Sequence, residues 1–287
     1  MSGDRVLQLL LEEEVGHLRR LEACRADIAD IRGDQDAVHP VRGSEWLTQD
    51  LGSFEWLIGG LIATETVNIM VADPTIGKTT LLVQLTISLT KGIPFIGHPV
   101  AQKYPALTVL AEGSLLAFRN RWSCACKTLG VDPSEIDWYV QPAGMTEYAI
   151  GSRGLEVLIE ESKAKLVILD TIGYFHSGDE NDANDWKRHV MKPLRALTSK
   201  YGCSFILVHH QNKAHDKQGW QKGRGTTAMF ADCDLWLRLE KPEGQPGLAS
   251  FRDLYVDKNK YAACGYRMAL DFNSLGAVLP RGSRAIA

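Results

Sequence analysis

The 287-residue sequence lacks an apolar run of the roughly 18 residues that a membrane-spanning helix requires. Its first segment, MSGDRVLQLLLEEEVGHLRR, places three glutamates after a short apolar stretch, where a secretory leader would carry its cleavage site. The formal net charge is −3, so no basic surplus equips the chain to coat nucleic acid by bulk charge. We therefore expect a cytoplasmic protein that makes no membrane contact and in which any polyanion site is local.

Cysteine is also scarce: the chain has six. Their spacing is not that of a disulfide framework, so we interpret them as reduced thiols. Cys124 and Cys126 form a C-x-C, but no second Cys/His pair follows at zinc spacing, so we expect no zinc site. The sequence contains no internal repeat and no low-complexity segment. With 45% hydrophobic and 23% charged residues, it is typical of one large globular domain or of a domain with an appendage.

The first part of the chain, residues 4–31, has the apolar spacing of an amphipathic helix. Its apolar residues recur at intervals of three and four: Leu7, Leu11, Val15, Leu18, Leu21, Cys24, Ile28 and Ile31. The polar stretch Gly33–Gly43 that follows has the composition of a linker. We therefore predict an N-terminal helix and linker over residues 1–43 and the main domain over 44–287. The apolar stripe needs a partner, which is either the chain's own body or a neighbouring subunit.

From Trp56 onward, predicted strands and helices alternate. Strands are expected at Val67–Ala72, Leu107–Ala111, Trp138–Gln141, Leu166–Leu169 and Ser204–Val208, and helices at Thr79–Thr90, Leu116–Leu129, Leu155–Ser162 and Asp185–Lys200. Fully apolar runs such as LVIL and FILV are typical of parallel strands buried on both faces. After Thr227, segments joined by Gly/Pro turns indicate antiparallel strands at Leu235–Leu239, Ala249–Asp257 and Tyr266–Phe272. The sequence thus predicts an α/β fold with a mostly parallel, helix-flanked sheet and an antiparallel C-terminal extension.

A phosphate-binding motif lies in the segment Val67–Gln84, VNIMVADPTIGKTTLLVQ. Against the template G-x-x-x-x-G-K-[ST] it keeps Gly77, Lys78 and Thr79, and it has Ala72 in place of the first glycine. Backbone N–H groups at a helix N-terminus favour bound phosphate, Lys78 would reach the β/γ-phosphates, and Thr79 would hold Mg²⁺. The residues expected to contact the nucleotide are Asp73, Pro74, Thr75, Ile76, Gly77, Lys78, Thr79 and Thr80. The alternative is a strand-turn-helix that merely contains GKT.

Polar residues follow three of the predicted strands, at the sheet edge where ligands of parallel α/β sheets bind. Asp170 follows LVIL and is a candidate second carboxylate for Mg²⁺, or else a helix cap. Glu112 follows TVLA and could take the proton of an attacking water, or cap the helix that comes after it. His209 and His210 follow FILV. The histidine nearer the nucleotide would sense the γ-phosphate, and the alternative for both is a polar group satisfied at the sheet edge.

A local basic segment, QNKAHDKQGWQKGRGTT, covers residues 211–227. Long basic loops inside a compact domain are usually functional or disordered. The residues expected to grip a nucleic-acid backbone, with one aromatic plane for base stacking, are Lys213, Lys217, Trp220, Lys222 and Arg224. The alternative is a solvated flexible loop.

The order of these motifs resembles the RecA-like P-loop ATPases. It is most similar to the small hexameric helicases typified by the plasmid replication protein RepA and to related AAA_25-type ATPases. The motifs are the phosphate loop, AEGS, LVILDT, HSGDEND, GCSFILVHH, VHHQNK, RGTT and DKNK, with GIPFIG after the first helix of the core. The resemblance covers roughly Trp56 to Gly276 and is specific, because several short motifs occur in the right order at the right spacing.

The resemblance implies an ATP hydrolase that uses Mg²⁺. Its implied site residues are Lys78 and Thr79 on the triphosphate and the metal, Glu112 as catalytic base, Asp170 as the metal- and water-orienting carboxylate, His210 as γ-phosphate sensor, and Arg121 as a further cation near the phosphates. Ala72 and Thr75 depart from the glycines that are common in the family's loop.

The family also implies a cation that reaches the γ-phosphate of a neighbouring subunit, so that the site needs a ring or filament. In DKNK this cation would be Lys258 or Lys260, with Arg224 as the reserve candidate. RepA-type helicases place a finger arginine on the strand after RGTT, where this chain has Asp234 and then Arg238.

Together with the basic segment, the resemblance implies an ATP-driven homohexameric single-stranded DNA translocase, a replicative helicase of a plasmid, phage or other mobile element. Single-stranded DNA, further copies of the chain, and a replication initiator or primase are the expected partners. Two rival hypotheses stay open. One is a recombination mediator or regulatory ATPase without unwinding activity, and the other is a degenerate nucleotide-binding module that assembles with a replication partner through the helix at residues 4–31.

Overall fold

The computed structural model describes residues 42–48, 55–111, 113–142, 148–211, 227–242, 250–272 and 278–285. Its contacts divide the chain into two units, Met1–Ser53 and Phe54–Ala287. Within the first unit the description is confined to the short helix α2 (Gly43–Thr48) and the residue before it. The helix predicted over residues 4–31 and the linker as far as residue 41 lie outside the described residues, and Gly43, the last residue of the predicted linker, is the first residue of α2. The proposed boundary after residue 43 stays a prediction.

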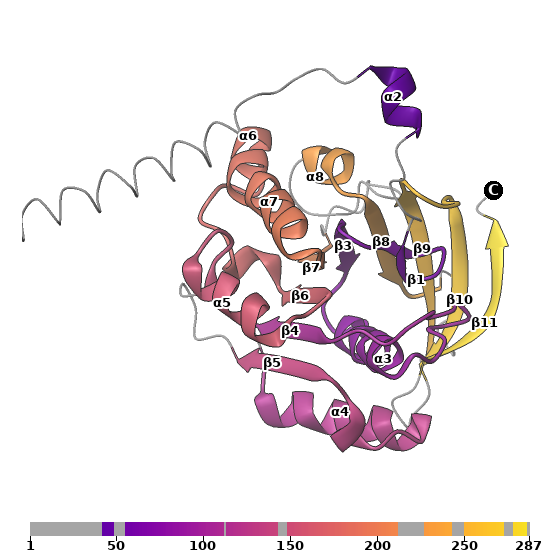
Figure 1. Cartoon of the computed structure of the whole chain (residues 1–287). Helices are drawn as coiled ribbons and strands as arrows, with labels where there is room; N and C mark the ends of the chain where they lie inside the picture. The colour runs from indigo at the N-terminus through magenta and orange to yellow at the C-terminus, as the bar shows by residue number, and fades with distance from the viewer. Residues whose placement is uncertain are drawn as a thin grey trace, which may run out of the picture. The chain divides into compact units, whose positions relative to one another are not determined.

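The second unit is built on a nine-stranded sheet, in the order β11-β10-β9-β8-β3-β7-β6-β4-β5 among the described residues (Figure 1). The parallel strands are β3 (Val67–Ala72), β4 (Ala106–Leu110), β5 (Trp138–Pro142), β6 (Leu166–Asp170), β7 (Ser204–His210) and β8 (Leu235–Glu240). The antiparallel strands are β9 (Phe251–Asn259), β10 (Tyr266–Phe272) and β11 (Val278–Ala285). This arrangement confirms the predicted RecA-like α/β fold with an antiparallel C-terminal extension.

Helices cover both faces of the sheet. The longer ones are α3 (Lys78–Lys91), α4 (Leu115–Leu129), α5 (Arg153–Ser162) and α7 (Lys192–Tyr201), and α8 (Thr227–Asp232) precedes β8. Short 3-10 turns lie at Pro133–Glu135 and Ile172–Tyr174. Among the described helices, none combines the length and the apolar composition needed to cross a bilayer.

The helix predicted at Asp185–Lys200 is present but not uniform. Helix α6 (Ala183–Trp186) runs into a π-helical turn, Lys187–Met191, before α7 begins. Pro193 sits in the first turn of α7, and a proline has no N–H to donate to the carbonyl four residues earlier. The α-helical hydrogen-bond pattern therefore cannot run unchanged through this point.

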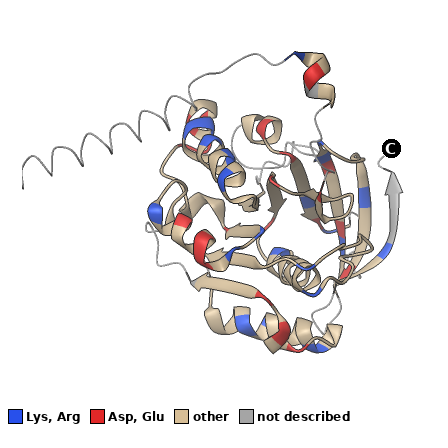
Figure 2. Ribbon diagram, in the orientation of Figure 1, with Lys and Arg blue, Asp and Glu red and all other residues tan. Residues whose placement is uncertain are grey.

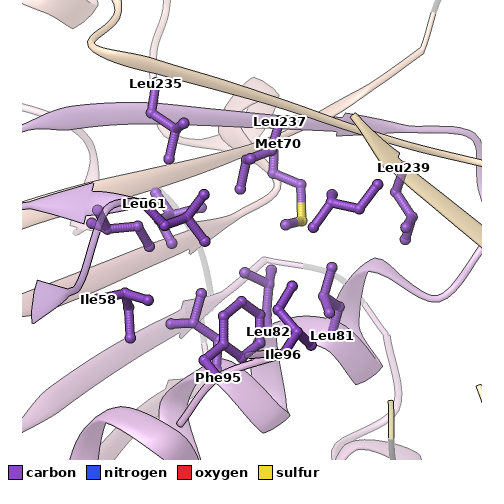
Figure 3. Packing of buried hydrophobic residues seen from close by; sticks show 14 of the residues in the cluster. Ile58, Leu61, Met70, Leu81, Leu82, Phe95, Ile96, Leu235, Leu237 and Leu239 are labelled. Carbon is purple, nitrogen blue, oxygen red and sulfur yellow. The ribbon is translucent and has the colours of Figure 1, made fainter. Parts of the chain in front are cut away.

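Two hydrophobic cores lie on the two faces of the central strand β3. Met70 and Ala72 pack on the face that α3 covers with Leu81, Leu82, Leu85 and Leu89, and Figure 3 shows this cluster. On the other face, Val67, Ile69 and Val71 pack in the cluster that contains Leu155, Leu194 and Leu197 from α5 and α7. Because both faces of β3 are buried, its carboxyl end, where the phosphate loop begins, is anchored in the core.

The sequence did not predict the edge strand β11, the helix α8 or the hairpin of β1 (Trp56–Ile58) and β2 (Ile62–Ala63). Strand β11 contains Pro280, which the sequence pattern alone does not favour in a strand. An edge strand tolerates proline because one of its sides needs no ladder donor, and the pairing with β10 is irregular between Ala269 and Leu270.

Candidate nucleotide-binding site

The phosphate loop lies where β3 ends and α3 begins, at the carboxyl edge of the parallel sheet. Its backbone takes left-handed values at Thr75 (φ 66°) and Gly77 (φ 115°), and Gly77 is the N-cap residue of α3. The strand before and the helix after the motif are therefore both present, as the phosphate-binding chemistry requires. Ala72 ends β3 without a positive φ, so its backbone does not need the glycine of the template.

Gly77 is required for two independent reasons. Its φ favours glycine, and a Cβ atom there would lie 2.6 Å from Cε1 and 3.0 Å from Cδ1 of Phe272 on β10. Real Cβ contacts are longer than these distances, so the ring of Phe272 packs against the loop in the space that a side chain would occupy.

Lys78, the first residue of α3, is buried and folds back over the start of the loop. Its Nζ donates hydrogen bonds to the carbonyl oxygens of Ala72 (2.8 Å) and Asp73 (3.0 Å). The ammonium group is thus held inside the turn that a phosphate would share. This position fits a lysine that reaches the β/γ-phosphates.

Thr79 and Asp170, the two predicted Mg²⁺ ligands, line the same pocket between α3, α4 and the sheet. The other lining residues are Leu82, Val83, Thr86, Thr108, Phe118, Trp122 and Ile168. Within the described ranges, no three or more His, Cys, Asp or Glu side chains form a metal cage. Mg²⁺ commonly binds through one or two protein ligands and completes its shell with water and substrate phosphates, so one hydroxyl and one carboxylate are enough to hold it.

Glu112 lies outside the described residues, but its neighbours on both sides are defined. The N–H of Ala111 donates to the carbonyl of Asp170 (2.7 Å), so the chain entering Glu112 runs beside the end of β6. The N-cap of α4 is Ser114, whose hydroxyl accepts from the N–H of Ala117 (3.4 Å). Serine therefore fills the capping role that was the alternative for Glu112.

The two histidines at the end of β7 have different surroundings. His209 is buried, its Nδ1 accepts from the N–H of His210 (2.9 Å), and its Nε2 lies 3.7 Å from a carboxylate oxygen of Glu180. His210 pairs in register with Ala72, at the start of the phosphate loop. The structure therefore places His210 nearer the loop than His209 along the pair of strands.

Gln211, for which the sequence predicts no role at the nucleotide site, also contacts the loop. Its N–H donates to the carbonyl of Ala72 (3.2 Å), and its side-chain amide donates to Glu240 (2.6 Å) at the end of β8. It thereby joins the ends of β7, β3 and β8. The sequence offered one signal, since Gln211 follows the two histidines directly.

Lys258 and Lys260, the cations predicted to reach a neighbouring subunit, lie near the start of β8, whereas the phosphate loop of the same chain follows the carboxyl end of β3. Lys258 pairs in register with Trp236 near the start of β8, whereas the loop follows the far end of β3. The Nζ of Lys258 donates to the carbonyls of Phe230 (2.6 Å) and Ala231 (2.8 Å). Lys260 donates to Asp234 (2.9 Å). Neither lysine belongs to the nucleotide site of its own chain.

Arg238, the arginine that follows Asp234 on β8, is buried inside the subunit. Its Nε and Nη2 donate to the two oxygens of Asp257 at 2.7 and 3.0 Å, and its Nη1 lies 2.7 Å from Glu240. The guanidinium also stacks over Tyr255, 4.0 Å from the ring centroid. Two carboxylates and a ring hold Arg238 in place, so it does not project as a finger.

Arg121 lies on an exposed face of α4. The predicted DNA-binding residues Lys213, Lys217, Trp220, Lys222 and Arg224 lie outside the described residues. Their segment connects Gln211, beside the phosphate loop, with α8, whose last carbonyls accept from Lys258.

Two contacts from the C-terminal strands complete the loop's surroundings. The Nε of Arg252 on β9 donates to the carbonyl of Ile76 (2.7 Å), and Phe272 covers Gly77. No feature of the sequence marks either residue, because each acts on a loop far away along the chain.

A search among curated proteins found no match. The profile of the AAA domain family AAA_25 matches residues 37–216, well over half of the chain, and the matched segment includes Lys78, Thr79 and Asp170. The phosphate loop follows the central strand, and Asp170 lines the same pocket as Thr79. The chain belongs to the AAA_25 family of AAA-domain P-loop ATPases.

Proposed function

We propose that the protein is an ATP-driven, homohexameric translocase on single-stranded DNA and serves as a replicative helicase of a plasmid, phage or other mobile element. One observation carries the ATPase part: Thr79 and Asp170, from different elements, line one pocket at the start of α3. The fold supports the proposed translocase activity, and so does the position of Lys258 and Lys260 near the start of β8, away from the phosphate loop.

In this proposal the chain's own groups position ATP for attack on its γ-phosphate. The N–H groups of the loop and the ammonium of Lys78 would bind the phosphate oxygens, with the positive end of α3 behind them. Thr79 and Asp170 would hold Mg²⁺, which when bound neutralises charge on the phosphoryl oxygens. Glu112 would take the proton of the attacking water, and His210 would respond to the γ-phosphate.

The location of Lys258 and Lys260 supports a site that is completed between subunits. Within one chain Lys258 lies opposite the start of β8 and Lys260 opposite Asp234 just before it, whereas the loop follows the far end of β3, so a phosphate that they approach belongs to another copy. Such a contact joins one end of a subunit to the opposite end of the next, which is a head-to-tail interface. Head-to-tail interfaces generate rings when the rotation closes.

DNA binding is assigned to the basic segment between β7 and α8. Residues of both charge signs are distributed over the described helices and strands (Figure 2). Phosphates of single-stranded DNA would therefore meet a local loop, with little sequence preference. Loading onto DNA is expected to require a replication initiator or primase.

Replacing Lys222 and Arg224 together with alanine is expected to spare basal ATP hydrolysis and to remove its stimulation by single-stranded DNA. Both changes leave the phosphate loop intact and remove charges that would contact DNA phosphates. Hydrolysis is measured with and without an oligonucleotide, and Lys187→Ala in the helical π turn serves as the surface-charge control. If single-stranded DNA still stimulates ATP hydrolysis normally in the double variant, the segment does not bind DNA as proposed.

A strand-displacement assay on a forked duplex separates the helicase from the recombination mediator or regulatory ATPase. The helicase hypothesis predicts ATP-dependent displacement that is lost in the double variant. DNA binding and ATP hydrolysis without displacement would favour the mediator. If the assembled protein hydrolyses no ATP at all, the chain is a nucleotide-binding assembly module.

A further inference from the structure

The antiparallel strands β9, β10 and β11 hold the phosphate loop and its helix at three points. Arg252 donates to the carbonyl of Ile76 (2.7 Å), and the ring of Phe272 fills the space beside Gly77. On α3, the amide of Gln84 pairs with both backbone groups of Val278, donating to its carbonyl (2.7 Å) and accepting from its N–H (2.6 Å). All three strands lie beyond residues 37–216, where the family match ends.

Arg252 is built into this position. Its Nη1 donates to the carbonyl of Phe251 (2.7 Å), and the guanidinium carbon lies 5.5 Å from the ring centroid of Phe272. Burial lowers the pKa of the guanidinium without removing its charge at neutral pH. The planar group therefore has its Nε fixed toward the loop while the ring that covers Gly77 supports it.

The hydrogen bond to Ile76 constrains a peptide group that a phosphate would use. The carbonyl of Ile76 and the N–H of Gly77 belong to one planar peptide, and in a trans peptide they point to opposite sides. Holding the carbonyl on the side of Arg252 therefore turns the Gly77 N–H to the other side, away from β9. A loop that binds phosphate by its N–H groups depends on this orientation.

The loop has more need of such support than one rich in glycine. Thr75 carries a positive φ that glycine adopts at lower cost, and Gly77 is the one glycine between Ala72 and Lys78. Strained backbone of this kind persists when its surroundings over-determine it. Arg252 and Phe272 provide these surroundings from outside the motif.

We propose that Arg252 is a positioning residue of the nucleotide site, which fixes the Ile76–Gly77 peptide so that the Gly77 N–H faces the phosphates of ATP. This inference rests on the proposed ATPase function. It makes the C-terminal extension part of the ATP site of its own subunit, in addition to any contact between subunits.

The test compares Arg252→Met with wild type and with Arg267→Met in the full chain. Arg267 lies on the same sheet extension and pairs with Asp253 (2.7 Å), so its loss removes a similar ion without touching the loop. Dissociation constants for ATP come from titration with a fluorescent ATP analogue. Hydrogen–deuterium exchange is followed in peptides that cover residues 73–81 and in peptides from β9–β11.

Arg252→Met is expected to weaken ATP binding about tenfold, as for the loss of a hydrogen bond from a charged donor. Exchange should rise in residues 73–81 and stay at the wild-type rate in β9–β11, whereas Arg267→Met leaves both the loop and the affinity unchanged. Arg252→Lys, which keeps the charge but not the planar donor, should lie in between, and it replaces the methionine variant if that chain does not fold.

Two results would overturn the role of Arg252. One is ATP affinity within about twofold of wild type, and the other is faster exchange throughout β9–β11, which would show a structural role only. If wild type itself fails to bind ATP, the proposed function and this inference both fall, so the two failures are distinguishable.

Discussion

Lys78→Ala is expected to lower ATP hydrolysis by at least about a hundredfold, as for the loss of one group that stabilises transition-state charge. In the structure the Lys78 ammonium lies inside the turn of the loop, held by the carbonyls of Ala72 and Asp73. Alanine at the first position of a helix is well tolerated, so the fold should persist while the charge is lost. Phosphate release at saturating ATP and Mg²⁺ measures the effect.

Lys91→Ala is the matched control, because Lys91 ends the same helix, away from the phosphate loop, and forms an ion pair with the exposed Glu135. Its hydrolysis rate should equal that of wild type, and both variants should show the wild-type melting temperature to within a few degrees. A Lys78→Ala protein that hydrolyses ATP at the wild-type rate would show that the loop is not the catalytic site.

Asp234→Ala is expected to cost about 2–4 kcal/mol of unfolding free energy, because it removes the acceptor at the centre of a buried ion network. The carboxylate side chain is 2% exposed and accepts from the N–H of Val67 (2.8 Å), from Lys260 (2.9 Å) and from Arg195. It joins the start of β3 to α7 and to the end of β9. Arg195 and Lys260 keep 35% and 39% exposure, so water can hydrate the charges that lose their partner, which limits the loss.

The unfolding free energy that Asp234 contributes should fall as the pH is lowered. Burial alone would raise the pKa of this carboxyl group, but hydrogen bonds from Arg195, Val67 and Lys260 outweigh burial and lower it below 3.8. A depressed native pKa means that the stabilisation is complete above the unfolded value, about 3.9, and is lost as pH falls through the native value. The stability difference between wild type and Asp234→Ala should therefore be constant near neutral pH and shrink below pH about 4.

Urea denaturation at several pH values measures this difference. Glu160→Ala is the control, since its ion pair with Arg153 lies on the surface and such pairs contribute about 0–1 kcal/mol. If Asp234→Ala costs no more than the control at pH 7, the network does not stabilise the fold. A difference that grows as the pH falls would contradict the assigned direction of the pKa shift.

The elements with strong local signals were predictable from the sequence. The buried run Val67–Ala72 and the segment Tyr266–Phe272 are strands with the predicted bounds, and the helix after GKT differs by one residue at each end. Asp170 was placed correctly at the end of its strand, because a fully apolar run before a carboxylate at a sheet edge is a local pattern. The sheet edge that such a residue occupies is predictable from sequence, whereas its role at that edge stays a prediction.

The contacts that complete the site were not predictable, because they join distant segments. In the sequence, nothing distinguishes Arg252 from other charged residues on strands. Its contact with Ile76 arises from the order of the strands in the sheet. The sequence does not predict the strand β11, because it contains a proline and a glycine. Its Val278 is nevertheless hydrogen-bonded to Gln84 of the phosphate-loop helix. Single-sequence patterns report faces and ends of elements, whereas pairing across the sheet depends on the whole fold.

The proposed motor requires that one subunit binds ATP and the next supplies the cation, and mixed rings test this requirement most directly. Lys78→Ala subunits are combined with subunits that carry Lys258→Gln and Lys260→Gln. Glutamine keeps a donor for the carbonyls and for Asp234 while it removes the charge. Native mass spectrometry verifies that the two kinds of subunit assemble together.

Each variant alone should be inactive, whereas an equal mixture should regain about a quarter of wild-type hydrolysis, since one head-to-tail interface in four then pairs an intact loop with intact lysines. Mixed rings that stay as inactive as their parents, or glutamine variants that hydrolyse ATP at the wild-type rate, would contradict a site shared between neighbouring subunits.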